Sequence, residues 1–224
     1  MILVIDLEAT CSDDGSITPE QMEVIELGAA WATPDGEVID TLQRFVRPTE
    51  RPTLTPFCMG LTHIEQASID AARSWPAVAA ELAEFARLHA GQCWGSWGAY
   101  DRRQIERESA RHGLADPLAG LPHVNLKATF AKARKIKQVG MATALQIVGL
   151  ELEGEHHRAL SDARNIARLL PWALGGKRTG RTLVSVSACQ EENLLGHPRP
   201  PASLRQLASA YQLPAKAQGF RPAF

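Results

Sequence analysis

Two acidic residues at the end of an apolar run are the first sign of chemistry in this sequence. The run Ile2–Ile5 leads into Asp6 and Glu8, and side chains two apart on a strand project from the same face. Acids separated by one residue occur five times in the chain, but only this pair ends a run apolar enough for a buried strand. The pair is therefore expected to present two carboxylates to one cation.

Two further acids stand at predicted helix starts. Asp101 follows the run Trp94–Tyr100, and Asp162 begins the last apolar helix five residues after His157. Each of them is also explained as a helix-capping acid, because carboxylates stabilise the first turn of a helix. If they join the first pair, the result is an oxygen-rich site without cysteine or paired histidine ligands. Such a site suits Mg²⁺ or Mn²⁺ rather than zinc.

A site of this composition is suited to phosphodiester hydrolysis. Two divalent ions about 4 Å apart can hold the attacking and the leaving oxygen of a phosphodiester. A neutral imidazole beside them can accept the proton of the attacking water, since free imidazole has a pKa of about 6.5. His157 is placed for that role.

Together these residues resemble the three motifs of the DEDDh 3′→5′ exonucleases, the DnaQ-like branch of the RNase H-like fold. The motifs are Asp6–Thr10, Ser96–Asp101 and His157 with Asp162 five residues on; Phe57–Ile64 is most similar to the Eri1-like and KapD-like subgroup. Three spaced motifs are far more specific than one. The resemblance spans residues 1 to 174 and implies an α/β fold, a mixed central sheet of about five strands flanked by helices.

The resemblance also implies a role for each residue. The expected ligands of two Mg²⁺ or Mn²⁺ ions are four acids, Asp6, Glu8, Asp101 and Asp162. The expected catalytic residues are Glu8 and His157, with His157 as the general base. Only His157 stands five residues before Asp162, as the motif requires, so the adjacent His156 is expected to be a surface neighbour.

Four residues are expected to border the terminal nucleotide: Ala9, Leu61, Thr62 and Trp97. Leu61 and Trp97 lie on apolar segments, where a leucine or an aromatic residue is more often part of the core. His63 departs from the resemblance, because a small residue is usual at its position. The fit of the base pocket is therefore open.

Residues 1–176 are predicted to alternate between strands and helices. The expected strands are Ile2–Ile5, Val24–Trp31 and Val38–Val46 as a hairpin, Cys93–Trp97 and His123–Leu126. The expected helices are Trp75–Ala90, Asp101–His112, Ala128–Lys135, Thr143–Leu150 and Ser161–Leu174. After Gly176 the composition shifts toward proline, serine and arginine, which predicts an exonuclease domain of residues 1–176 and a C-terminal extension of residues 177–224.

The chain carries 24 Lys and Arg against 25 Asp and Glu, a formal charge of −1, which excludes a protein that coats nucleic acid by charge alone. Residues 177–224 hold 7 basic and 2 acidic residues, a net +5 that leaves −6 for residues 1–176. Within Leu126–Leu150 a local cationic surface is expected from five basic residues and no acid: Lys127, Lys132, Arg134, Lys135 and Lys137. Scattered cysteines and the lack of a membrane-length apolar run favour a cytoplasmic protein that does not bind membranes.

The expected function is metal-dependent 3′→5′ hydrolysis of single-stranded RNA or DNA to nucleoside 5′-monophosphates. The choice between RNA and DNA stays open, because it depends on contacts to the 2′-hydroxyl. The alternative is a regulatory or nucleic-acid-binding protein on an exonuclease fold that acts through a partner, and the full set of acids with a histidine favours the enzyme. The extension is expected to be a solvated or partly packed tail, with RNA binding or self-association as its alternatives.

Overall fold

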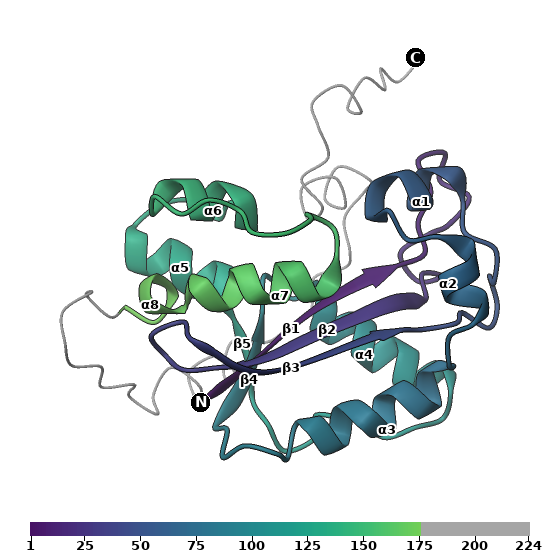
Figure 1. Cartoon of the computed structure of the whole chain (residues 1–224), viewed down its shortest axis with the longest axis horizontal. Helices are drawn as coiled ribbons and strands as arrows, with labels where there is room; N and C mark the ends of the chain where they lie inside the picture. Colours follow the sequence, from purple (N-terminus) through teal and green to yellow (C-terminus); the bar gives the residue numbers. More distant parts are fainter. Residues whose placement is uncertain (176–224) are drawn as a thin grey trace.

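The computed structural model describes residues 1–175, which form a five-stranded mixed sheet with helices on both faces (Figure 1). The strand order is β3-β2-β1-β4-β5; β1 to β3 are antiparallel, and β1, β4 and β5 are parallel. The strands are β1 (Ile2–Ala9), β2 (Val24–Ala32), β3 (Val38–Phe45), β4 (Cys93–Ser96) and β5 (His123–Asn125). The predicted mixed sheet of about five strands is confirmed. The predicted extension of residues 177–224 lies outside the described residues.

The helices fall into three groups in Figure 1. One sheet face is covered by α5 (Leu126–Arg134), α6 (Met141–Ile147), α7 (Ala159–Arg168) and α8 (Leu170–Ala173). The opposite face is covered by α3 (Trp75–Phe85) and α4 (Tyr100–Arg111). The short helices α1 (Pro56–Thr62) and α2 (Gln66–Asp70) lie beyond the end of β1.

The two central strands read as apolar runs because helices cover both of their faces. All nine residues of β2 are buried, and so are seven of the eight residues of β1. Ile2 and Val4 pack in the core beneath α7, whereas Leu3 and Ile5 pack in the core beneath α3. This alternation continues along β1, so Asp6 and Glu8 lie on the sheet face that α7 covers.

Helix α3 ends five residues earlier than the sequence predicts. Arg87 and Leu88 donate to carbonyls three residues back, which is the bonding of a tightened helix end. The apolar spacing placed Leu88 in the core, but its side chain is 64% exposed. The chain leaves the helix there because it must turn back to enter β4.

The predicted helix Ser161–Leu174 is two helices, α7 and α8, that meet at Leu169. Pro171 explains the break, since proline has no N–H to donate and its ring clashes with the carbonyl four residues before it. The interruption ends α7 and turns the chain, so that α8 packs against α5.

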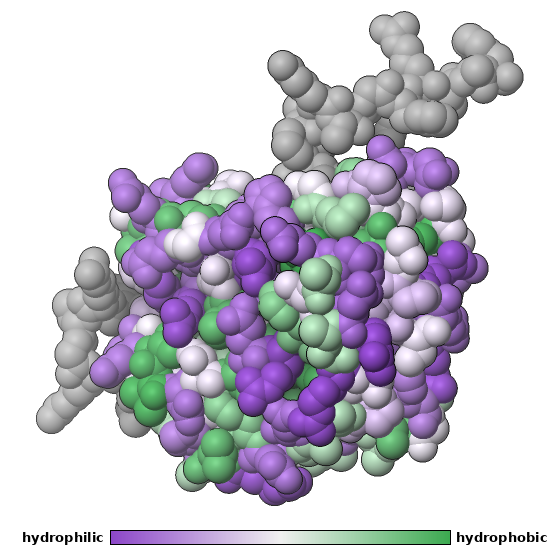
Figure 2. All heavy atoms as spheres, turned by 45° about the vertical axis from the view of Figure 1, so that its right-hand side comes forward, coloured by the Kyte–Doolittle hydropathy of each residue, from purple (hydrophilic) through white to green (hydrophobic). Residues whose placement is uncertain are grey.

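Apolar residues on the surface are dispersed. Hydrophilic residues cover most of the face in Figure 2, and the apolar residues among them form small separate groups. Among residues 1–175, the large hydrophobic residues that stand exposed are Ile39, Leu88, Leu114, Ile136 and Ile147. No helix among residues 1–175 has the length and apolar character that crossing a membrane requires.

Helix α7 approaches β2 as closely as backbone allows, and Gly28 makes this possible. A Cβ atom at Gly28 would lie 2.2 Å from the backbone carbonyl carbon of Ala159 and 2.3 Å from the nitrogen of Leu160. Gly28 pairs with Asp6 in the antiparallel register of β1 and β2. The missing side chain therefore lets the first turn of α7 lie directly beside the acids of β1.

Replacing Gly28 with Ala is expected to lower the free energy of unfolding by about 1–3 kcal/mol, because the methyl group must push α7 away from the sheet. Chemical denaturation monitored by circular dichroism measures the change. Gly60→Ala is the matched control, since Gly60 is exposed within α1 and an added Cβ would meet open space. It should leave stability equal or raise it by about 0.4–1 kcal/mol; equal effects of the two variants would contradict the close-approach argument.

Candidate active site

The acids of β1 point toward the first turn of α7. Glu8 is buried, with 2% of its surface exposed, and Asp6 is half-buried. Carboxylate oxygens of Asp6, Glu8 and Asp162 all lie within 4.8 Å of one another. The structure thus brings together two residues of one strand and a third from a helix more than 150 positions away in the sequence.

Asp101 enters the same site from α4, which begins directly after β4. Its Oδ1 accepts a hydrogen bond from the backbone N–H of Leu7 at 3.1 Å, which ties the start of α4 to β1 between the two acids. The N-cap of α4 is Ala99, not Asp101. Asp101 does stand in the first turn of α4, where the helix dipole favours a carboxylate, but it is also 5% exposed and faces the site.

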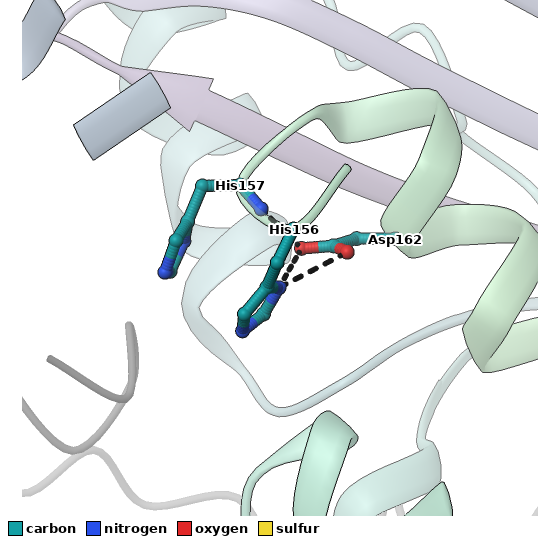
Figure 3. A group of neighbouring side chains, drawn as sticks. All are labelled: His156, His157 and Asp162. Atoms are coloured by element: carbon teal, nitrogen blue, oxygen red, sulfur yellow. Dashed lines mark hydrogen bonds and ion pairs between the residues drawn. The ribbon is translucent and has the colours of Figure 1, made fainter. Parts of the chain in front are cut away.

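Asp162 is held by the turn that precedes its helix. Its Oδ2 accepts the backbone N–H of His157 at 3.1 Å. It also lies 2.9 Å from Nδ1 of His156, and Oδ1 lies 3.2 Å from the same nitrogen (Figure 3). The N-cap of α7 is Arg158, so Asp162 is likewise not the cap of its own helix.

The two histidines differ from the sequence prediction in one respect. His156, expected at the surface, is half-buried and its imidazole contacts Asp162, so that expectation is corrected. The rings of His156 and His157 stack with centroids 4.0 Å apart, and Figure 3 shows them side by side on one side of Asp162. The motif spacing singles out His157, but it contains no information on which ring reaches the acid, because that depends on the turn between them.

Burial and mutual repulsion raise the pKa values of the acids. The pKa of Asp6 lies well above its usual value, first because of burial and then because of Asp101 and Asp162. Burial and Asp162 likewise raise the pKa of Glu8. Burial raises the pKa of Asp101 to about 6. A charged set of this kind is costly without a counter-ion, which is what a divalent cation supplies.

The side-chain donors fit such a cation. Oε2 of Glu8 is buried and accepts no hydrogen bond from any of residues 1–175, which leaves a carboxylate oxygen available to a cation. Hard oxygen ligands are the ones that Mg²⁺ and Mn²⁺ prefer. Asp162 also belongs to a second group of converging ligand atoms, with His156 and His157.

His157 is held in the neutral form. Burial, followed by the nearby charges of His156 and His63, lowers its pKa to about 4. Its backbone is left-handed, with φ of +63°, a conformation that a residue with a side chain adopts only where its surroundings hold it. The ring is therefore uncharged at neutral pH and able to accept a proton.

The acids and both histidines line one pocket together with Trp97. Trp97 donates from Nε1 to the carbonyl of Val139 at 3.0 Å, which fixes its ring at the rim. The other three predicted nucleotide contacts do not line this pocket. Ala9 and Thr62 are buried, and the hydroxyl of Thr62 donates to Cys58 within α1. A contact of Ala9, Leu61 or Thr62 with nucleotide stays a prediction.

The pocket also contains residues that sequence reasoning missed. Tyr100, Met141 and Ile166 line it with the predicted residues. Sequence reasoning also missed Glu26, which does not line the pocket but is an acid of β2 with 0% exposure. A carboxylate inside an otherwise apolar buried strand was a usable signal, since acids are almost never fully buried without a partner.

Acids from β1, α4 and α7 lie together in one pocket on a mixed five-stranded sheet, the fold of RNase H-like DEDDh nucleases. The sequence profile of the RNase T exonuclease family matches residues 3–170. The chain therefore belongs to this exonuclease family, and the resemblance to DEDDh exonucleases is confirmed.

Individual proteins similar to this chain are more specific than the family match. Human ERI1 exoribonuclease 2 is 32% identical over 197 residues, covering 77% of this chain and 28% of that protein. The 3'-5' exonuclease eri1 of Schizosaccharomyces pombe is 26% identical over 198 residues, covering 75% of this chain and 66% of that protein. The crystal structure of the nuclease domain of 3'hExo, a DEDDh family member bound to rAMP, matches with a TM-score of 0.69 at 26% identity, covering 75% of this chain and 88% of that one. This chain thus spans 28% and 66% of the two curated relatives.

Replacing Glu8 with Gln is expected to stabilise the metal-free protein while removing metal binding. The neutral amide relieves the repulsion that burial intensifies, and a gain of about 1 kcal/mol raises the unfolding midpoint by roughly 2–4 °C in a domain of this size. Thermal unfolding with EDTA measures the midpoint, and calorimetric titration with Mn²⁺ measures binding. Glu37→Gln, at an exposed turn, is the control and should change neither quantity.

The same repulsion fixes the sign of the pH dependence. Because the folded pKa values of Asp6 and Glu8 are raised, their stabilising contribution is complete below the unfolded values near 4 and is lost as the pH rises through the folded values. Mn²⁺ should therefore raise the wild-type unfolding midpoint more at about pH 7.5 than at about pH 5. An equal rise at both pH values, or a lower midpoint for Glu8→Gln in EDTA, would contradict this account of the site.

Proposed function

We propose that this chain is a divalent-metal-dependent 3′→5′ exonuclease that hydrolyses single-stranded nucleic acid and releases nucleoside 5′-monophosphates. The observation that carries the proposal is the convergence of Asp6, Glu8 and Asp162 within 4.8 Å, beside buried Asp101 and a neutral imidazole. We propose Mg²⁺ or Mn²⁺ as the cofactor, with two ions in the site. A cytoplasmic location remains a prediction.

RNA is the first substrate to test. Relatives of this chain are named exoribonucleases, and one solved relative is described as recognising the 3' end of a histone mRNA stem-loop. Another solved structure of the same fold, E. coli exonuclease I, holds a dT13 oligonucleotide. Both classes of strand thus occur on this fold, and the 2′-hydroxyl contacts that separate them are not fixed by the acids.

The roles of the chain's own residues follow from their positions. The bound ions would supply charge stabilisation at the scissile phosphate. Asp6, Glu8, Asp101 and Asp162 would hold the ions, and Asp101 also fixes β1 to α4. His157 accepts the proton of the attacking water, since it is neutral at pH 7 and lines the same pocket. Trp97 offers an aromatic face at the rim, on which a base can stack.

The predicted cationic surface lies beside this rim. Of its five predicted residues, Lys127 is half-buried near the start of α5, whereas Lys132, Arg134, Lys135 and Lys137 are exposed at the end of α5 and just after it. The segment they occupy continues to Val139, whose carbonyl holds the indole of Trp97. We propose that these cations bind phosphates of the strand 5′ to the scissile bond, because phosphate contacts position a strand without reading its sequence.

The first test is nuclease activity itself. Purified protein with Mn²⁺ or Mg²⁺ should shorten a 5′-labelled single-stranded RNA from its 3′ end and release 5′-monophosphates, and EDTA should stop the reaction. Asp6→Ala should lower the rate by at least about 10³-fold, since an ion of the site loses a ligand. Gel assays with RNA, DNA and stem-loop substrates measure this. A wild-type protein that leaves all of them intact would favour the alternative of a regulatory protein acting through a partner.

His157→Ala is expected to lower kcat by about 10²–10⁴-fold with Mn²⁺ binding retained, because the lost group moves a proton and holds no ion. The low pKa of His157, about 4, places its acidic limb in the pH–rate profile well below the value of free imidazole. His156→Ala is the matched control and should cost much less, since His156 contacts Asp162 rather than the attacking water. Equal losses in both variants, or a limb near pH 6.5 that survives His157→Ala, would assign the base elsewhere.

A further inference from the structure

The turn that carries His157 needs an anchor. The residue stands in the left-handed region, and its neighbours Glu155 and His156 are half-buried or exposed. On its C-terminal side, the carbonyl of Arg158 accepts the backbone N–H of Asp162 at 2.9 Å. The position of Arg158 therefore sets both the turn with His157 before it and the first turn of α7 with Asp162 after it.

Arg158 is bound to the sheet by a buried carboxylate, that of Glu26. Arg158 donates from Nε to Oε2 at 3.1 Å and from Nη2 to Oε1 at 3.2 Å. The backbone N–H of Ala159 donates to Oε2 of the same carboxylate at 3.1 Å. Two parallel hydrogen bonds from one guanidinium fix its direction as well as its distance. Phe45 lies under the guanidinium, with Cζ of Arg158 5.5 Å from the centre of the phenyl ring.

The anchor lies directly beside the acids of the site. Glu26 pairs with Glu8 in the register of β1 and β2. Glu26 also accepts a hydrogen bond from Gln43 of β3, which fixes its carboxylate from the other neighbouring strand. The same carboxylate thus sets the distance between the turn of His157 and the strand that carries Asp6 and Glu8.

A second contact holds the other end of the turn. Glu155 lies within hydrogen-bond reach of Nδ1 of His63, the left-handed C-cap of α1. Glu155 also lies 3.7 Å from Arg158. His63 is the residue that departs from the small residue usual at its position, and here its side chain connects α1 to the turn. Both partners are about half exposed, so this contact is weaker than the buried one.

We propose that Glu26 is a positioning residue for catalysis: through Arg158 it fixes the turn of His157 and the first turn of α7 against β1, and His63 with Glu155 secures the far end of that turn. The inference rests on the proposed function of the site and goes beyond it, since neither Glu26 nor Arg158 touches substrate or metal in it. A fully buried carboxylate next to Glu8 adds repulsion that an apolar contact would avoid. The Glu26–Arg158 pair therefore contributes the orientation of the turn rather than stability of the fold.

The test compares the two contacts in steady-state hydrolysis of a labelled RNA with Mn²⁺. Glu26→Gln should lower kcat about 10–100-fold with KM changed less than about 3-fold, because misplacing the base by an ångström costs up to about 100-fold in rate. Arg158→Lys should also lower kcat relative to the wild type, since lysine keeps the positive charge but lacks the planar fork. His63→Gly should lower kcat less than about 5-fold, as an exposed pair implies. The double variant Glu26→Gln/Arg158→Met should have the kcat of the slower of its two single variants, because the two residues act as a unit.

A second measurement separates this proposal from the proposed function. Nuclear magnetic resonance of the imidazole groups reports the conformation of the turn without any turnover. The chain has seven histidines, and the variants His156→Ala and His157→Ala identify the signals of these two. Glu26→Gln should shift or broaden the signals of His156 and His157 while the unfolding midpoint stays within a few degrees. An inactive wild type whose signals respond would overturn the exonuclease proposal and keep the anchor. Unchanged signals, a kcat within 3-fold of wild type, or additive losses in the double variant would overturn the anchor.

Discussion

The structure depends on one electrostatic constraint, the placement of several carboxylates in a buried space where they repel one another. Burial raises the pKa values of Asp6, Glu8 and Asp101, and the negative charge of Asp162 raises all three further. Within residues 1–175, His156 contacts Asp162 and Arg158 pairs with Glu26. The fold must therefore hold these acids together by other means, and it leaves their charge for a cation from outside.

Three features of the backbone hold them. Parallel pairing of β1 with β4 brings the start of α4 to the acids, and the Leu7 N–H fixes Asp101 there. The absence of a side chain at Gly28 lets α7 lie against β2. The core on either side of the sheet then makes these approaches rigid, since packed interiors do not deform continuously. The strands and helices are thus arranged so that a repulsive cluster is the consequence of favourable packing everywhere else.

Sequence predicted the parts of this arrangement that are local or repeat at fixed spacing. Strand β1 and its two acids follow from an apolar run and the period of a strand, and Asp101 and Asp162 follow from motif spacing.

The parts that depend on distant contacts were not predictable. Leu88 fits a helical apolar face, yet the chain turns away before it. His156 reads as a neighbour of the motif histidine, and only the turn before α7 shows that its ring contacts Asp162. Pro171, by contrast, was a local signal of a helix break that the apolar pattern overrode.

Charge placement connects these observations with catalysis. Arg158, the cation nearest the turn, is directed to Glu26 and not to the β1 acids, so it neutralises the carboxylate that positions the turn. Had Arg158 paired with Glu8, the protein would be more stable without metal and would bind metal less well, because a cation would have to displace the guanidinium. By directing its own positive charge to Glu26, the chain separates the carboxylate that supports the site from the acids that we propose to bind the ion. Part of the negative charge of residues 1–176 thus lies in the acids that we propose to be neutralised by a divalent metal.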